Sequence, residues 1–272
     1  MTSAHVLIPC FADTRRVSEP ARRYGNGAQC VLPQTGNRTR FLLGSASERR
    51  RDEIEHHATR PSEPPSLKSC PMTRDTNTAH PRPEPADAVA QTRCWIERVV
   101  LAHNLCPFAR SPFEADRIRY MVSDARGAED LLGDLREAVL HLHNSPAADT
   151  ETTLLIHPGA LLDFLDYNDF LDLADALIED LGLSDEYQIA SFHPDYQFAG
   201  TRPQDAENYT NRSPHPMLHL LRQSSLSAVL DRYPDPEAIP ERNIEILRAL
   251  GGERLRSTLA GCRLPADKEA DG

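Results

Sequence analysis

Two histidines occupy equivalent places in the sequence, each directly after a short apolar run and directly before a proline. His157 follows TTLLI, and His193 follows YQIASF. If both runs are parallel strands of one sheet, both imidazoles lie at its carboxyl edge, where open α/β sheets bind their ligands. Adjacent strands are about 4.8 Å apart, so the two rings would share a metal ion, a water molecule or a substrate oxygen. The alternative is that each imidazole ends its strand by bonding a loop carbonyl.

Asp195 and Cys106 are the residues that would complete such a site. Asp195, two residues after His193, either orients an imidazole or binds a metal, or it is an ordinary turn residue. Cys106 lies three residues after His103, on one face of a predicted helix. A helix C-terminus raises the pKa of a thiol, so this position suits a metal ligand or a buried apolar residue better than a nucleophile. The catalytic candidates are His157, His193 and Asp195, and the candidate ligands of a divalent metal are His157, His193 and Cys106.

The candidate substrate-binding groups come from residues 194–216, a long stretch with neither helical nor strand periodicity. Arg212 carries a planar donor fork that suits a carboxylate or a phosphate, and a helix predicted to begin near Pro216 would add free N–H groups. The alternative is that Arg212 pairs with acidic side chains of the domain. His219 is expected inside that helix as a core or boundary histidine. The predicted substrate-binding residues are Arg212, Asn208, Tyr209 and Ser213.

Other patterns in the sequence are weaker candidates for a functional site. Four aspartates stand at three-residue steps, at Asp163, Asp166, Asp169 and Asp172. Such steps drift by about 60° around a helix, so we predict a solvated acidic face and not a metal site. The sequence contains no GxxxxGK[ST], GxGxxG, GxSxG, HExxH or paired CxxC motif. It therefore gives no support for nucleotide binding by the usual loops or for serine hydrolase chemistry.

Short apolar runs alternate with helical periodicity, and this pattern defines the predicted fold. The predicted strands are residues 117–123, TTLLI and YQIASF, and the predicted helices are 87–105, 128–143, 161–181, 217–230 and 239–250. We predict an α/β fold with a small three-stranded, mostly parallel sheet, βαβ crossovers, a cover of helices and additional C-terminal helices.

The periodicity needed for a core is confined to the second two-thirds of the 272-residue chain. We predict a disordered leader over residues 1–85, a single α/β domain over 86–252 and a polar tail over 253–272. Met72 opens an ordinary polar lead-in to a helix, so we interpret residues 1–71 as an over-extended gene start and not as a functional arm. A chain that begins at Met72 should then keep its thermal stability.

Charge separates the same two parts. Residues 1–71 carry 11 Lys+Arg and 7 Asp+Glu, which leaves 19 and 34 for the rest of the chain. The leader has no interleaved aromatic residues or dense basic clusters, so we expect no nucleic-acid partner. No window approaches the roughly 20 apolar residues of a membrane span, and no secretion signal or disulfide spacing stands out. We expect a cytoplasmic protein with reduced thiols and no membrane partner.

Several long blocks follow one another along the domain: NLCPFARSPF, TTLLIHP, DFLDYNDFLDLAD, IASFHPDYQFAG, ENYTNRSPHPMLHLLR and YPDPEAIPERN. Together they resemble the bacterial family known as domain of unknown function 1415. The resemblance runs from about Thr92 to about Leu250 and covers essentially the whole predicted domain. It implies a stand-alone cytoplasmic domain, and it carries no catalytic residues over to this chain.

Two functions remain open from the sequence. The first is a small enzyme, with or without a divalent metal, that acts on an anionic small molecule at the carboxyl ends of the strands. His157 and His193 would then be ligands or acid/base groups, and Arg212 would hold the anion. The second is a non-catalytic ligand-binding or protein-interaction domain, in which the same polar groups fix a long loop. The substrate, the metal and the oligomeric state stay open.

Overall fold

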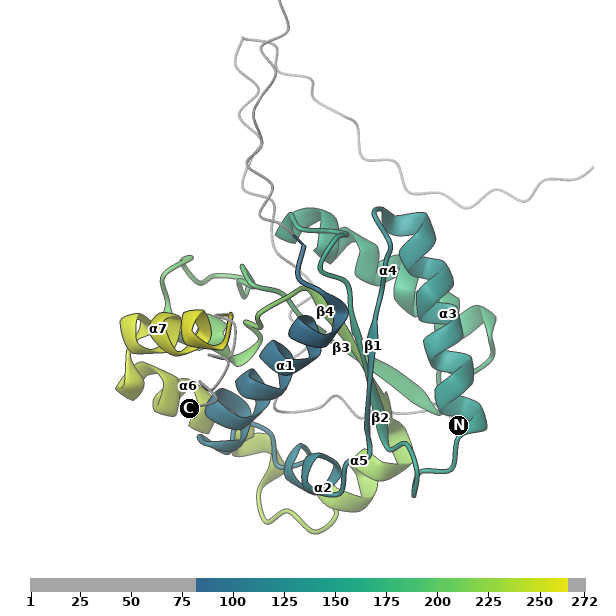
Figure 1. The fold of residues 1–272 in the computed structure, drawn as a ribbon. Coiled ribbons are helices and arrows are strands. Elements are labelled where there is room, and N and C mark those ends of the chain that lie inside the picture. Colours follow the sequence, from purple (N-terminus) through teal and green to yellow (C-terminus); the bar gives the residue numbers. More distant parts are fainter. Residues whose placement is uncertain (1–81, 264–272) are drawn as a thin grey trace, which may run out of the picture. The chain divides into compact units, whose positions relative to one another are not determined.

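The computed structural model describes residues 82–263, which belong to one compact unit (Figure 1). The candidate start at Met72 and all but the last residues of the predicted leader lie outside this range. The described part is a mixed α/β structure built on one four-stranded sheet.

The sheet has the strand order β1-β2-β4-β3. Its strands are β1 (Ile118–Val122), β2 (Thr152–Ile156), β3 (Tyr187–Phe192) and β4 (Met217–Arg222). β1 and β2 are parallel, whereas β4 is antiparallel to both of its neighbours. The three predicted strands therefore run in the same direction. The prediction of a three-stranded, mostly parallel sheet was wrong, because β4 separates β2 from β3 and pairs with both of them in the antiparallel direction.

β4 was not predicted, because residues 217–230 were assigned to one helix. The structure splits that segment into β4 and the helix α5 (Gln223–Leu230). β4 is a central strand with both faces covered, and four of its six residues are buried. A short apolar run of this kind does not alternate, so its periodicity does not distinguish a strand from a helix.

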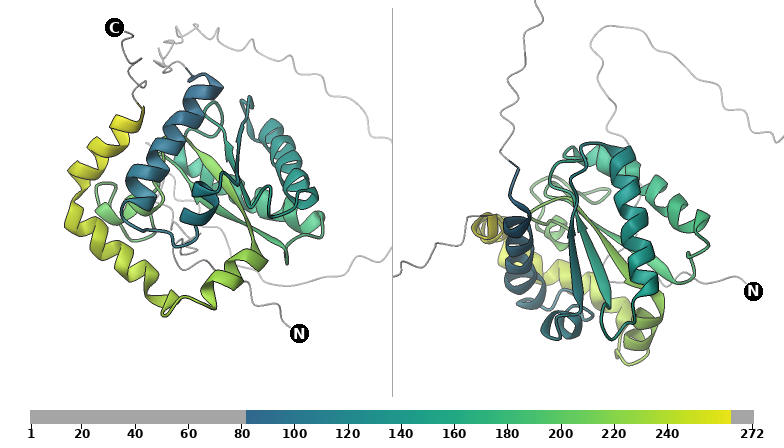
Figure 2. Two further views of the ribbon diagram at one scale, coloured as in Figure 1. Left: turned by 60° about the horizontal axis from the view of Figure 1, so that its bottom comes forward. Right: turned by 45° about the vertical axis from the view of Figure 1, so that its right-hand side comes forward.

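Helices cover both faces of the sheet (Figures 1 and 2). α3 (Ala128–Asn144) and α4 (Phe164–Asp180) pack on one face, against side chains such as Leu155 and Leu218. The other face meets α1 (Pro85–Trp95), its continuation as a π-helix η1 (Ile96–Leu101), α6 (Ile239–Leu250) and α7 (Gly252–Arg263). Because side chains alternate along a strand, neighbouring residues of β2 and β4 contribute to two separate cores.

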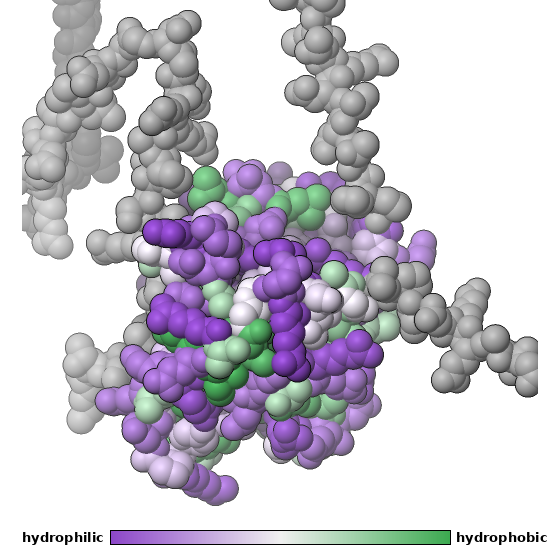
Figure 3. Space-filling view, turned by 90° about the vertical axis from the view of Figure 1, so that its left-hand side faces the viewer, coloured by the Kyte–Doolittle hydropathy of each residue, from purple (hydrophilic) through white to green (hydrophobic). Residues whose placement is uncertain are grey.

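The predicted polar tail was wrong in its first part, because α7 occupies residues 252–263. Leu255, Leu259 and Cys262 recur at helical spacing and are buried against the core. Residues 264–272 lie outside the described range. The side of the molecule that carries α6 and α7 shows hydrophobic residues gathered between hydrophilic ones (Figure 3).

The remaining elements are short. α2 (Arg110–Glu114) lies next to the start of β1, and two 3-10 helices, η2 (Ala206–Thr210) and η3 (Pro236–Ala238), interrupt the loops. Asp163 is the N-cap of α4, where its carboxylate accepts from the N–H groups of Leu165 and Asp166. All four aspartates of the three-residue series are exposed, so the predicted solvated acidic face is confirmed.

Candidate functional site

His157 and His193 lie at the same edge of the sheet, on the face covered by α4. They are not neighbours, because Met217 of β4 pairs with both Ile156 and Phe192 between them. The ring of Tyr167 contacts both imidazoles instead, with ring centroids 5.8 Å from His157 and 5.2 Å from His193. A tyrosine on α4 therefore takes the position that a shared ligand would need.

Both imidazoles are fully enclosed and bond the loop that follows β2. His157 Nδ1 donates to Ala160 O at 3.0 Å, and His193 Nε2 donates to Leu161 O at 3.2 Å. Burial lowers both pKa values, that of His157 to about 4, so both rings are neutral at pH 7. These contacts match the alternative in which each histidine ends its strand and fixes a loop.

The predicted metal site is not assembled. Asp195 is exposed, and it bonds His193 through its backbone N–H, which donates to Nδ1 at 3.0 Å. Cys106 belongs to the core on the opposite face of the sheet. It also lies beyond the end of the first helix, after the left-handed residue Asn104, and therefore shares no helical face with His103. Within residues 82–263, no three His, Cys, Asp or Glu side chains gather in a way that would hold a metal ion.

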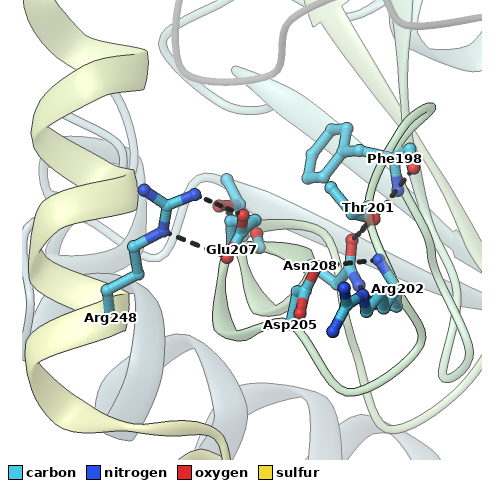
Figure 4. A network of polar contacts seen from close by, with 8 residues as sticks. Phe198, Thr201, Arg202, Asp205, Glu207, Asn208 and Arg248 are labelled. Carbon is cyan, nitrogen blue, oxygen red and sulfur yellow. Dashed lines mark hydrogen bonds and ion pairs between the residues drawn. The ribbon is translucent and has the colours of Figure 1, made fainter.

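The loop between β3 and β4 uses its polar side chains to hold its own backbone (Figure 4). The Oδ1 atom of Asn208 accepts from Phe198 N at 3.0 Å and from Thr201 Oγ1 at 2.8 Å, and its Nδ2 donates to Arg202 O at 2.7 Å. Arg248 of α6 pairs with Glu207 at 2.7 Å and ties the loop to the helix. Asn208 thus uses its amide on the loop itself.

The helix start and the available arginine on which the predicted anion site depended are not found in the structure of residues 82–263. Pro216 precedes strand β4, so no helix start is present there to supply free N–H groups. The Arg212 guanidinium donates to Tyr196 O at 3.1 Å and to Pro203 O, and it stacks on the Tyr209 ring at 4.8 Å. Ser213 is buried and donates to His215 O. Arg212, Tyr209 and Ser213 are therefore occupied within the loop.

A cavity of about 300 Å³ lies elsewhere, on the face of the sheet that meets α1. Ile118 and Thr152, the first residues of β1 and β2, line one end of it, together with Leu221 near the end of β4. The cavity thus begins at the opposite end of the sheet from His157 and His193, and it extends along the other face of the sheet to Phe192. Its wall is mainly apolar and includes Trp95, Ile96, Val100, Phe108, Phe192 and Leu226.

The wall formed by the first helix has an unusual geometry. Its residues 96–101 are a π-helix, in which Ala102 N donates to Glu97 O and Leu105 N donates to Val100 O. π-helical turns are rare and frequently occur at functional sites. Ile96 and Val100, on this segment, line the cavity, as does the adjoining Trp95. The buried indole N–H of Trp95 has no hydrogen-bond partner among residues 82–263.

His219 is one of the polar residues that line this cavity. Its Nε2 atom lies 2.7 Å from Thr152 Oγ1, and that hydroxyl donates its own proton to Leu220 O. Nε2 must therefore carry the imidazole proton, which leaves Nδ1 as an acceptor. Burial lowers the pKa of His219 to about 4, even though the side chain keeps some accessible surface. Since His219 lines the cavity, we infer that the accessible part of its side chain faces the cavity.

Two arginines line the cavity, and both are already bound. Arg117 pairs with Glu151 at 2.9 Å and also donates to Ala147 O and Ser111 Oγ. Arg222 donates to three carbonyls near the end of α3, those of Leu142, Ser145 and Thr150. The cavity therefore combines a mainly apolar wall, the neutral imidazole of His219, the Arg117–Glu151 ion pair and Arg222, whose Nε is buried without a hydrogen-bond partner among the described residues.

Sequence reasoning did not find this site. Cys106 does line it, but as a wall residue and not as the predicted partner of two histidines. His219 could not be placed without β4, because a helical assignment of residues 217–230 points its side chain differently. A π-helix has no sequence signature of its own. The part of the cavity wall that it forms, residues 96–101, could therefore not be predicted.

Fold and site together define a mixed α/β domain with a mainly apolar cavity on one face of its sheet. The family model described as "Protein of unknown function (DUF1415)" matches residues 87–257, and the chain belongs to this family. Comparisons with curated proteins and with solved structures gave no match. Among the helices of residues 82–263, none combines the length and the apolar character needed to cross a membrane.

Proposed function

We propose that this domain binds a small, mainly apolar molecule in the cavity between the sheet and the first helix. The observation that carries this proposal is a partly open, mainly apolar cavity of about 300 Å³ with the imidazole of His219 in its wall. Ligand sites of proteins have this character, since apolar walls supply affinity and a few polar groups set orientation.

The enzyme predicted from the sequence, acting on an anion near His157 and His193, is the second candidate. Its supporting groups are bound to the loops around them, so the geometry favours the cavity. Thermal stabilisation by phosphate or sulfate that disappears in Arg212→Ala would favour the anionic substrate instead.

Trp95 provides a direct assay, because it is the only tryptophan of the sequence and lines the cavity. The probe is N-phenyl-1-naphthylamine, a neutral apolar dye that accepts excitation energy from tryptophan. We expect saturable quenching of the Trp95 emission, accompanied by dye emission. Ala228→Phe on α5, which enlarges a residue of the cavity wall, should weaken dye binding by at least about tenfold, roughly the loss expected for a steric clash.

Ala176→Phe is the matched control, since Ala176 is also exposed and lies on α4, on the other side of the sheet. It should leave dye binding unchanged. Absence of saturable quenching, or equal effects of the two substitutions, would overturn the proposal.

A further inference from the structure

We infer that the ligand of this cavity is a neutral molecule that presents a hydrogen-bond donor, such as a hydroxyl or an amide N–H, to Nδ1 of His219. The inference rests on the proposed function and specifies the ligand class for the same cavity. His219 would then be the residue that determines specificity.

The hydrogen bonds around His219 fix which atom is available to a ligand. The Thr152 hydroxyl has a single proton, and it donates that proton to Leu220 O on β4. Its oxygen, 2.7 Å from Nε2, must therefore accept the imidazole N–H. The remaining ring nitrogen, Nδ1, carries a lone pair and accepts no hydrogen bond from the protein among residues 82–263. A ligand that bonds it must supply the proton.

Hydrogen bonding selects against anions next to His219. The charge of Arg117 is paired with Glu151. Arg222 is bonded among the described residues only to neutral groups, the Tyr187 hydroxyl and the carbonyls of Leu142, Ser145 and Thr150, and its Nε is buried without a hydrogen-bond partner. Among the described residues that line the cavity, no other lysine or arginine is present. A carboxylate would lose its hydration, and at His219 it would face the lone pair of Nδ1 in place of a hydrogen-bond donor.

The protonation state of His219 agrees with this selection. Burial lowers the pKa of its imidazole to about 4, so the ring is neutral at pH 7 and does not attract an anion. An apolar ligand without a donor would cover the Nδ1 lone pair and leave it unpaired, which is unfavourable. A neutral, mainly apolar ligand with one hydrogen-bond donor brings no buried charge and also pairs the Nδ1 lone pair.

Three probes of similar size and shape separate these possibilities: 4-propylphenol, 4-propylanisole and 4-propylbenzoate. They share an apolar body and differ in presenting a donor, an acceptor only, or a negative charge. Binding to the full chain at pH 7.5 is followed by Trp95 fluorescence excited at its red edge. We expect the phenol to bind at least about tenfold more tightly than the anisole, the difference expected for one buried hydrogen bond, and the benzoate to bind most weakly.

His219→Phe keeps a flat ring but removes the acceptor, so it should bring the phenol and the anisole to nearly equal affinity. If this variant does not fold, the three affinities of the unaltered protein still decide the question. Binding of all three probes with equal affinity, or preference for the benzoate, would overturn the inference while leaving the cavity as a ligand site. Failure of every probe and of the naphthylamine dye would instead overturn the proposed function.

Discussion

Thr152 and His219 are hydrogen-bonded across the β2–β4 pair, with 2.7 Å between the hydroxyl oxygen and Nε2. The pair is diagonal, because the register places Thr152 opposite Leu221 and Leu154 opposite His219. The threonine hydroxyl also donates to Leu220 O, so one buried oxygen links the imidazole to the backbone of β4. This relay fixes the tautomer of the only imidazole in the cavity wall.

The relay predicts a stability difference between two substitutions at one position. Thr152→Val keeps the shape of the side chain but leaves the His219 N–H and the Leu220 carbonyl without this partner, so we expect a loss of about 1–3 kcal/mol. Thr152→Ser keeps the hydroxyl and should lose less. Urea denaturation of both variants measures the difference. Equal stability of the valine and serine variants would show that the hydrogen bonds contribute nothing net.

A second prediction concerns the end of the β3–β4 ladder. The Tyr167 hydroxyl accepts from Phe192 N at 2.9 Å and donates to Met217 O at 2.9 Å, so it bridges the last residue pair of the two strands. Tyr167→Phe removes two buried hydrogen bonds from the end of this ladder, and we expect it to destabilise the fold by about 1–3 kcal/mol. Denaturant unfolding provides the measurement.

The control for that prediction is Tyr187→Phe, since the Tyr187 hydroxyl only accepts from Arg222, which has three other partners. It should cost less than Tyr167→Phe. The opposite order would contradict the bridging role of Tyr167.

The sequence predicts most elements of this fold, because α3, α4, α6 and the first three strands show the periodicity of amphipathic helices or short buried runs. β4 was not predicted, and the reason is physical. Residues 217–222 are buried on both faces, so no polar alternation marks them as a strand. α7 was missed because its polar composition outweighed three apolar residues at helical spacing.

The candidate site was less predictable than the fold. The sequence places His157 and His193 at one edge, and the structure confirms this common edge. It does not reveal that β4 lies between them, or that Tyr167 fills the intervening space. The cavity depends on the packing of α1, α2 and α5 over the sheet, and contacts between distant segments leave no pattern in one sequence.

A third prediction concerns Cys94 of α1 and Cys262 of α7, two free cysteines whose side chains are hydrogen-bonded to each other. Burial, followed by the hydrogen bond with Cys94, raises the pKa of the Cys262 thiol to about 12. Relative to an ordinary thiol of pKa about 8.5, its thiolate fraction at pH 8 falls by about three orders of magnitude. We therefore expect iodoacetamide to modify Cys262 slowly in the native protein and rapidly in urea. Peptide mass spectrometry gives both rates, and equal rates would contradict the assigned environment.

The last prediction is the pH dependence of stability. Burial lowers the pKa of His157 and of His219 from 6.5 to about 4 in the folded protein. Below pH 6.5 the unfolded chain takes up protons at these positions, while the folded protein stays neutral there until about pH 4. The unfolded state then binds more protons, so the free energy of unfolding falls as the pH falls. Each histidine contributes a slope of up to about 1.4 kcal/mol per pH unit within this window, and none above it.

Urea denaturation at pH 7.5, 6 and 5 measures that slope, and His157→Asn tests one contribution to it. Asparagine supplies an amide N–H for Ala160 O, which His157 Nδ1 normally donates to at 3.0 Å, but it does not titrate. The variant should be less stable at pH 7.5, because a smaller side chain replaces a fully buried ring stacked on Tyr167. Its stability should nevertheless decline less steeply between pH 6 and pH 5, by about one proton. An unchanged slope would mean that His157 titrates alike in the folded and unfolded chain, and that its ring is not held neutral by burial.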